Sequence, residues 1–327
     1  MRRRALLLLM PALAWAQPDW RRVAVPYVAP QAWLESLWTR WYVPRSREFA
    51  DAARALVQAQ GRLCDGGAPA QAQAAWRRAM TAWERLSAVA IGPLLERRSA
   101  RRIDFAPTRP ALIRRAIEQG ESDLARVGAP AKGLPALEWL LWKQRPAAGS
   151  PSCAYAQRVA AEIADEAAAL ADAFATPREW SDEAVAASFG ELLNQLVAGI
   201  EGLRWAQIER PLKEGKRQFP RAASGASAQA WAARWDALRQ LVTFQAHAPD
   251  APVSLEAFLR GRGLNPLADR VVDAVRRGDA ALRHATPADA AALQQAASAL
   301  STLKRRVEED VAPALDVSIG FTDADGD

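Results

Sequence analysis

The chain has 327 residues, of which 50% are hydrophobic and 24% are charged, so it is long enough for more than one hydrophobic core and we expect two domains. Its formal charge of +6 includes three arginines within the first four residues, and the 40 basic and 37 acidic side chains that remain are nearly balanced. Because no long basic run follows, the composition argues against a nucleic-acid-binding protein.

The first 16 residues have the pattern of a secretory signal peptide. Three arginines, residues 2–4, precede an apolar run, residues 5–13, and the small-residue site Ala14-Trp15-Ala16. That run is far shorter than the roughly 20 residues that span a bilayer, and no later segment comes closer without a charge, so we expect no transmembrane segment. The residue directly after the cleavage site is Gln17 rather than a cysteine, and the arginines lack the polar flank of a twin-arginine signal, which predicts Sec-type export of a protein that is not a lipoprotein.

Two cysteines, Cys64 and Cys153, occur in the whole chain. In an exported protein such a pair predicts a single disulfide, here closing a long loop. On the chain-entropy model a loop of this length gives roughly 4–5 kcal/mol of stabilisation. The alternative is a pair of thiolate metal ligands, for which the sequence offers no supporting histidine or cysteine cluster.

Charged residues occur in two otherwise apolar or loop-like segments of the first half. Arg102 and Asp104 are two positions apart, which is consistent with either a local ion pair or one wall of a binding site. Glu138 lies in the apolar, aromatic stretch from Gly133 to Trp142. An ionised carboxylate in an apolar site loses hydration worth several kcal/mol unless a cation, an arginine or a metal pairs with it. The alternative for Glu138 is a side chain that points to water, as most helix-interior glutamates do.

The pattern is helical almost throughout, because apolar residues recur three and four positions apart and β-branched alternation is nearly absent. In the second half, apolar stripes run from Leu192 to Leu203 and from Leu293 to Val307. A helix stop at Thr176-Pro177 divides the chain, so we predict an all-α fold of two helical-bundle domains, residues 25–177 and 178–327. The expected helix N-caps in the second half are Ser181, Ser227, Ser254 and Thr286.

Two further groups of polar residues follow in the second half. Glu201 and Arg204 are three positions apart on one helix, which favours a surface ion pair over a pair of ligands. Near the end of the chain, Asp323, Asp325 and Asp327 alternate beside a glycine as in calcium loops, but no closing glutamate follows. Neither pattern alone defines a metal site.

Familiar catalytic motifs are absent from the sequence. The two histidines, His247 and His284, are far apart rather than flanking a glutamate on one helix, so a zinc peptidase of the usual kind is not indicated. The same scarcity of histidine argues against a nucleophilic triad, and phosphate loops, dinucleotide fingerprints and CxxC motifs are missing. We therefore expect a protein that is not an enzyme.

Several segments together resemble the imelysin-like family, also called peptidase family M75, from about Tyr27 to the last residue. The stretch from Lys132 to Leu141 is similar to the family signature GxHxxE, with Pro135 in the histidine position and Glu138 retained. The other segments that carry the resemblance are residues 49–64, Trp76 and Trp83 with 91–93, 102–107, 224–227 before Trp231, and 318–327.

The resemblance implies an exported, all-helical protein of two bundles with a groove between them, located in the bacterial periplasm or envelope and associated with iron acquisition. It also implies a ligand site near the signature, to which Gly133 and the serines of the 224–227 segment belong. Because Pro135 cannot coordinate iron, Glu138 is the one metal ligand of the signature that remains. The ligand-binding residues we expect are Arg102, Asp104, Gly133, Glu138, Glu201, Ser224 and Ser227.

The leading hypothesis is a periplasmic protein of iron uptake that binds a metal, an iron chelate or a partner in the groove between the bundles. An arginine beside carboxylates suits an anionic iron chelate better than a bare ferric ion, which prefers several hard oxygens without a competing cation. The partners would be iron-uptake components of the bacterial envelope. The alternatives are an M75-type peptidase and an envelope interaction module that uses some of the thirteen tryptophans and no metal.

Overall fold

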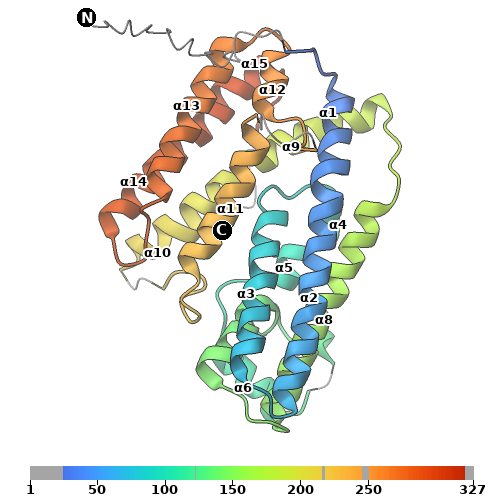
Figure 1. Cartoon of the computed structure of the whole chain (residues 1–327), viewed down its shortest axis with the longest axis vertical. Helices are drawn as coiled ribbons and strands as arrows, with labels where there is room; N and C mark the ends of the chain where they lie inside the picture. The colour runs from blue at the N-terminus through green and yellow to red at the C-terminus, as the bar shows by residue number, and fades with distance from the viewer. Residues whose placement is uncertain (1–24, 122, 216–217, 245–249, 321–327) are drawn as a thin grey trace, which may run out of the picture.

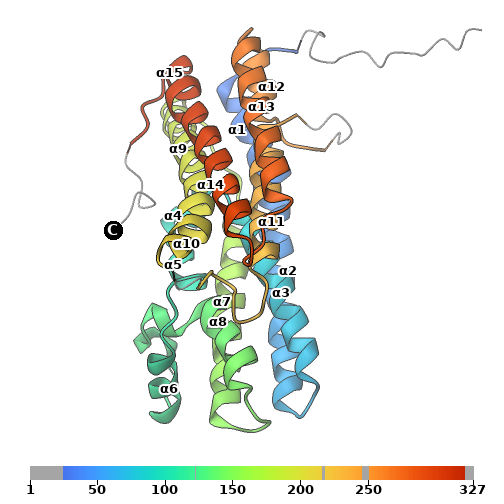
Figure 2. The ribbon, with the colours of Figure 1, turned by 90° about the vertical axis from the view of Figure 1, so that its left-hand side faces the viewer.

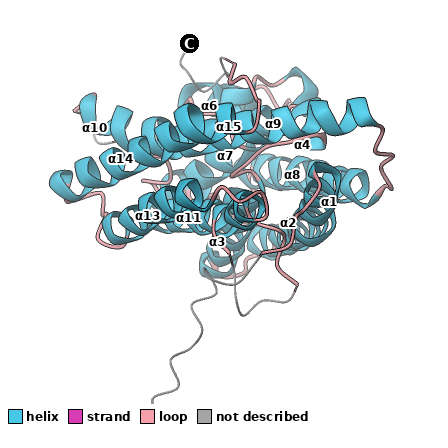
Figure 3. Ribbon diagram, turned by 90° about the horizontal axis from the view of Figure 1, so that it is seen from above, coloured by secondary structure: helices cyan, strands magenta, loops and turns pink. Residues whose placement is uncertain are grey.

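The computed structural model describes residues 25–121, 123–215, 218–244 and 250–320. These residues form helices joined by loops, with no strand among them, as Figure 3 shows. The predicted all-α class is therefore confirmed. The predicted signal peptide, His247 and the aspartates of the tail lie outside the described residues.

The first half of the chain is organised around α2, which packs against both α3 and α8 along the lower part of Figure 1. Helix α1 continues through a π-helical turn, η2, into α2, and α7 continues in the same way into η5. The helical elements of this half are α1 (Pro30–Leu37), η2 (Trp38–Tyr42), α2 (Val43–Cys64), α3 (Pro69–Leu86), α4 (Pro93–Glu96), α5 (Ser99–Ile103), α6 (Pro110–Glu118), η3 (Leu124–Arg126), η4 (Ala129–Ala131), α7 (Gly133–Trp139), η5 (Leu140–Gln144) and α8 (Pro151–Ala175).

The second half is organised around α13 and α14, which pack together, and α11, which contacts α13 on one side and α3 of the first half on the other. Figure 2 shows α11 beside α13 and directly above α3. The helical elements of this half are α9 (Asp182–Glu201), η6 (Gly202–Glu209), α10 (Arg210–Lys213), α11 (Ser227–Val242), α12 (Leu255–Arg260), α13 (Asn265–Leu282), α14 (Ala290–Arg305), η7 (Arg306–Val311) and α15 (Ala312–Ala314).

Proline and serine residues set many of the helix starts. Proline is the first residue of several helices, where the missing N–H costs nothing and the fixed φ suits the first turn; these are α1, α3, α4, α6 and α8. Two of the predicted serine caps are confirmed. Ser181 accepts a hydrogen bond from the N–H of Ala184, and Ser254 accepts one from the N–H of Ala257.

Two predicted caps are wrong. Helix α14 begins at Ala290, and its first turn is capped by Asp289 rather than by Thr286. Ser227 is the first residue of α11, but its hydroxyl donates to the carbonyl of Pro220 and does not cap the helix. In both cases the conformation of the preceding loop, and not the residue type alone, decides which polar side chain caps the first turn.

The predicted disulfide is confirmed between Cys64 and Cys153, whose Cα atoms lie 5.6 Å apart. It joins the end of α2 to the start of α8, two helices that pack against each other along their length. The bond therefore fixes one end of an interface that apolar packing holds along the rest.

Most of the tryptophans in the described residues belong to the core, as expected from their helical spacing. Trp76 and Trp83 of α3 are 0% and 2% exposed, and Trp38 and Trp41 are 8% and 2% exposed. The two halves of the chain also meet closely, because a Cβ on Gly199 of α9 would lie 2.0 Å from the carbonyl oxygen of Ala88. Only glycine permits this approach.

No helix among the described residues has the length and apolar character needed to cross a membrane.

Candidate functional site

Glu138, the residue singled out in the signature, is buried with 6% exposure on α7. Its carboxylate accepts hydrogen bonds from both the N–H and the hydroxyl of Ser224, at 2.8 and 2.7 Å. The side chain therefore does not point to water. Its direct partner is also not the cation that we expected, because backbone and serine donors from the loop before α11 satisfy the carboxylate.

Two other carboxylates, the buried Glu84 and the partly exposed Asp104, converge on Arg221. The guanidinium Nη2 donates to Asp104 at 2.6 Å and to Glu84 at 3.2 Å, and its own side chain is 3% exposed. The second oxygen of Glu84 accepts from Gln207 at 3.1 Å and from Arg234 at 3.4 Å. We call these five residues the Arg221 cluster.

The charges of the Arg221 cluster are divided between the two halves of the chain. Its acids come from residues before Thr176, namely Glu84 at the end of α3 and Asp104 directly after α5. Its arginines come from residues after Thr176, in the loop before α11 and on α11 itself. Electrostatic complementarity of this kind fixes the register of two packed surfaces.

The loop before α11 is held in place by serine and arginine contacts. Ser227 donates to the carbonyl of Pro220 at 2.6 Å, and the Ser224 hydroxyl, whose proton goes to Glu138, lies 3.0 Å from the carbonyl oxygen of Arg221. Arg77 of α3 donates to the carbonyl of Ser224 at 2.6 Å. Arg221 itself has a left-handed backbone, with φ of 67°, which is uncommon for a residue other than glycine. The predicted residues Ser224 and Ser227 therefore shape the loop that presents Arg221.

Within the cluster, burial and the neighbouring charges of opposite sign shift the pKa values in opposite directions. Burial raises the pKa of the Asp104 carboxyl, and Glu84 raises it further, while Arg221 and the indole N–H of Trp83 partly oppose the change. Burial by itself would lower the pKa of the Arg221 guanidinium, but Asp104, Glu84 and Glu138 together raise it above its usual value. Arg221 therefore remains the fixed positive charge of the site.

Gly133 allows the signature segment to approach the segment that contains Asp104. Its φ is +72°, and a Cβ at this position would lie 2.4 Å from the carbonyl oxygen of Ile103. The start of α7 can therefore pack directly onto the backbone that leads to Asp104. Of the predicted site residues, the structure brings together Asp104, Gly133, Glu138, Ser224 and Ser227.

Arg102 lies in a different cluster, although it is two residues from Asp104. Its Nη1 is 3.3 Å from the buried carboxylate of Glu166 on α8, and its side chain is 58% exposed. Glu166 also accepts two hydrogen bonds from Arg97, both at 2.9 Å, and one from Ser99 at 2.7 Å. We call these four residues the Glu166 cluster.

Glu201 is likewise separate from Glu138 in its contacts. It forms a bidentate pair with Arg204, at 2.8 and 2.5 Å, and lies 3.7 Å from Lys304 of α14. Glu201 is 6% exposed and the side chain of Arg204 is 20% exposed, so this ion pair is partly buried, whereas its spacing favoured a surface pair.

Four members of the site were not predicted: Glu84, Gln207, Arg221 and Arg234. A signal existed for Glu84, because it falls on the apolar stripe of Trp76, Met80 and Trp83 at helical spacing. Arg221 lies in a loop, where no periodicity marks a residue as buried. The remaining two come from helices whose neighbours the sequence alone does not identify.

The site reaches the surface at two side chains and contains unused hydrogen-bonding atoms. Asp104 and Arg234 are 18% and 17% exposed. The buried atoms Arg221 Nε, Arg234 Nε and Gln207 Oε1 have no hydrogen-bond partner among the described residues. Orphan atoms concentrated in one cluster are a feature of sites that hold water or ligand groups.

The carboxylates do not form the donor set that a bare iron ion needs. Among the described residues, no three histidine, cysteine, aspartate or glutamate side chains are grouped as metal ligands would be. Two of the carboxylates already pair with arginine, and Pro135 contributes no donor. A competing guanidinium disfavours a bare cation at this position.

These features define an all-helical protein whose two halves meet at a buried site of carboxylates and arginines. A family model described as Imelysin, peptidase M75, matches residues 42–326, and the chain belongs to this family. A search of curated proteins finds no match.

Two solved structures share the fold. An imelysin-like protein from Psychrobacter arcticum 273-4 aligns with a TM-score of 0.73 and 18% identity, over 91% of this chain and 100% of the other. A candidate iron-regulated protein A precursor from Parabacteroides distasonis ATCC 8503 aligns with a TM-score of 0.70 and 15% identity, over 85% of this chain and 93% of the other. At these identities the likeness concerns the fold.

Proposed function

We propose that this protein is an iron-associated binding protein that recognises an anionic iron chelate rather than a bare iron ion. The observation that carries the proposal is the Arg221 guanidinium, which occupies the centre of the carboxylate site. The Parabacteroides protein, which is described as iron-regulated, supports the association with iron.

The partly exposed edge of the Arg221 cluster would contact the ligand. Arg234 and Asp104 reach solvent there, so an arginine can bind chelate carboxylates while an acid accepts hydrogen bonds from chelate hydroxyls. Glu138 would act through Ser224, because that contact fixes the loop that presents Arg221. The function proposed here is binding, and it assigns no catalytic role to these residues.

The location of the protein belongs to the same proposal. The signal-peptide pattern of the first 16 residues supports export to the periplasm. The helix end at Ala175 supports a division of the chain near Thr176 into two bundles, with the ligand between them. Components of the envelope that deliver or accept iron would be the partners.

Thermal unfolding of the purified protein with ferric citrate, and separately with ferric, ferrous, copper and calcium ions, tests the proposal. Metal content as isolated is measured in parallel. We expect ferric citrate to raise the melting temperature, since ligand at about 100 times its Kd stabilises the folded state by about 2.7 kcal/mol. The bare ions should produce a smaller shift.

Glu138→Gln should remove the response to ferric citrate and leave the fold intact. Glu201→Gln is the matched control, because both glutamates are 6% exposed but Glu201 pairs elsewhere. A larger shift with a bare ion than with the chelate would contradict the proposal. Cleavage of casein that is lost in Glu138→Gln would instead establish the peptidase.

A further inference from the structure

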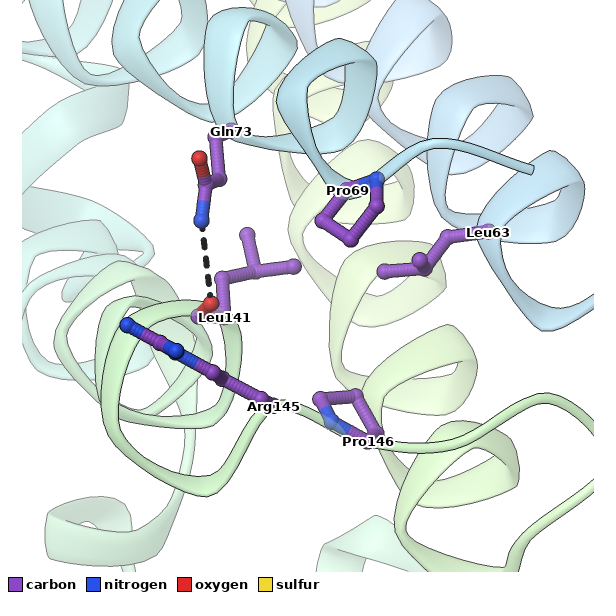
Figure 4. Close-up of a pocket in the computed structure, with 6 residues that line it drawn as sticks. All are labelled: Leu63, Pro69, Gln73, Leu141, Arg145 and Pro146. Atoms are coloured by element: carbon purple, nitrogen blue, oxygen red, sulfur yellow. Dashed lines mark hydrogen bonds between the residues drawn. The ribbon is translucent and has the colours of Figure 1, made fainter. Parts of the chain in front are cut away.

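A cavity of about 240 Å³ lies between the end of α2, the start of α3 and the segment that follows the helix of Glu138. Figure 4 shows Leu63, Pro69, Leu141 and Pro146 turned toward one another around it, with Gln73 and Arg145 on opposite sides of Leu141. Pockets that enclose drug-sized ligands measure roughly 300–1,000 Å³, so this one suits a ligand of one or two amino-acid residues in size.

The walls of this cavity are held by contacts that do not depend on a ligand. Gln73 donates its amide N–H to the carbonyl of Leu141 at 3.2 Å, which joins α3 to η5. Leu63 is adjacent to the disulfide-bonded Cys64, whose carbonyl accepts a hydrogen bond from the N–H of Gly149 at 3.1 Å. The cavity is therefore preformed, which lowers the cost of ordering its walls on binding.

The charge at the cavity is positive. Arg145 has a left-handed backbone, with φ of 51°, and its Nε lies 3.4 Å from the carbonyl of Trp142. The terminal nitrogens of its exposed guanidinium have no acceptor among the described residues. In the flanking segments, residues 60–73 and 139–150, Arg62 and Lys143 add positive charge and Asp65 is the single acid.

We propose that this cavity binds a small carboxylate with an apolar body, the carboxylate on Arg145 and the body against Leu63, Leu141 and the two prolines. An apolar pocket with one oriented polar group is the usual composition of a small-ligand site, and a guanidinium is the side chain that matches a carboxylate in geometry. The site is separate from the Arg221 cluster and does not rest on the function proposed above.

N-acetyl-L-leucine is the probe, with N-acetyl-L-leucinamide as the uncharged analogue, and binding to the purified protein is measured by calorimetry. We expect saturable binding of the acid and at least about tenfold weaker binding of the amide, which lacks the charge-assisted hydrogen bonds. The tripeptide N-acetyl-Ala-Ala-Leu represents a peptide C-terminus. Binding of this tripeptide would identify a peptide C-terminus as the ligand, whereas binding of N-acetyl-L-leucine alone would identify a free organic acid.

Arg145→Asn should weaken binding of the acid at least about tenfold, because asparagine tolerates a left-handed backbone but carries no charge. Arg98→Asn is the matched control, since Arg98 is also exposed and left-handed, with φ of 52°, and lies away from the cavity. Pro69→Phe, at an exposed first position of α3, should block the cavity while keeping Arg145.

Three results would each overturn the proposal: no saturable binding of the acid at millimolar concentration, equal binding of acid and amide, or full binding by both Arg145→Asn and Pro69→Phe. Glu138→Gln should leave this binding unchanged, whatever it does to the ferric citrate response. Failure at one site is therefore distinguishable from failure at the other.

Discussion

The Glu166 cluster and the Arg221 cluster both bury a glutamate and pair it with arginine, but they differ in where the arginines lie. Arg97 and Arg102 are 35% and 58% exposed, so Glu166 is neutralised by cations that remain hydrated. Arg221 is 3% exposed and Glu84 is 1% exposed, so that pair has lost water on both sides. The second arrangement is far more sensitive to the loss of one partner.

The two clusters also differ in the parts of the chain that they join. The Glu166 cluster links α8 to α5 and to Arg97, which directly follows α4 in the same half. The Arg221 cluster joins the first half to the second, through the loop before α11. Damage to it should therefore affect the contact between the halves, whereas damage to the Glu166 cluster should remain local.

The largest effect is expected for Arg221→Met. This change removes the charge at nearly constant volume and leaves the energetic cost of the left-handed backbone unchanged. Glu84 and Asp104 would lose their shared cation inside the protein, at a cost of about 3–5 kcal/mol in the free energy of unfolding. Urea denaturation measures it. Arg102→Met is the matched control, since an exposed arginine contributes at most about 1 kcal/mol. Equal losses in the two variants would remove the distinction between the clusters.

Glu166→Gln should have an intermediate effect. The amide keeps one oxygen for Ser99 but cannot accept the bidentate, charge-assisted bonds of Arg97, so we expect a loss of about 1.5–3 kcal/mol. Asp165→Asn, an exposed neighbour on the same helix, should change stability by less than about 0.5 kcal/mol. If Glu166→Gln lowers the free energy of unfolding no more than the control does, the charge of Glu166 does not contribute to stability through its hydrated arginine partners.

A smaller loss, of about 1 kcal/mol, is expected for Ser224→Ala. The variant removes the hydroxyl bond to Glu138 but keeps the backbone N–H bond to the same oxygen. Ser298→Ala on the exposed side of α14 serves as the comparison in the same urea titration. A loss well above 2 kcal/mol would show that the hydroxyl organises the whole loop rather than one bond.

The helical class was predictable because helical periodicity is a local property, and so was the disulfide because two cysteines allow one pairing. The neighbours Arg102 and Asp104 show where prediction stops. They are two residues apart in sequence, but α5 ends at Ile103, and the backbone of Asp104, with φ of −140°, turns out of the helix. The two side chains therefore belong to different clusters.

The candidate site was predicted in part for a similar reason. Glu138 could be recognised as buried from the apolar residues around it, but its partner Ser224 lies 86 residues away and comes from a loop. Resemblance to the family indicated that serine, whereas nothing in the sequence placed Arg221 between Glu84 and Asp104. Long-range contacts of loops depend on the packing of both halves, which local patterns do not encode.

The smallest expected effect is a pH dependence of stability, which tests whether burial or Arg221 controls the pKa of Asp104. Since burial and Glu84 raise the pKa of Asp104 above its usual value of 3.8, the folded protein holds that proton more tightly than the unfolded chain. The corresponding stability is present below pH 3.8 and is lost as the pH rises through the raised pKa. The cost of Asp104→Asn should therefore be greater near about pH 4 than at pH 7, while that of Asp165→Asn stays constant. A cost that instead grows with pH would mean that the guanidinium outweighs burial and that the ionised pair stabilises the junction between the halves.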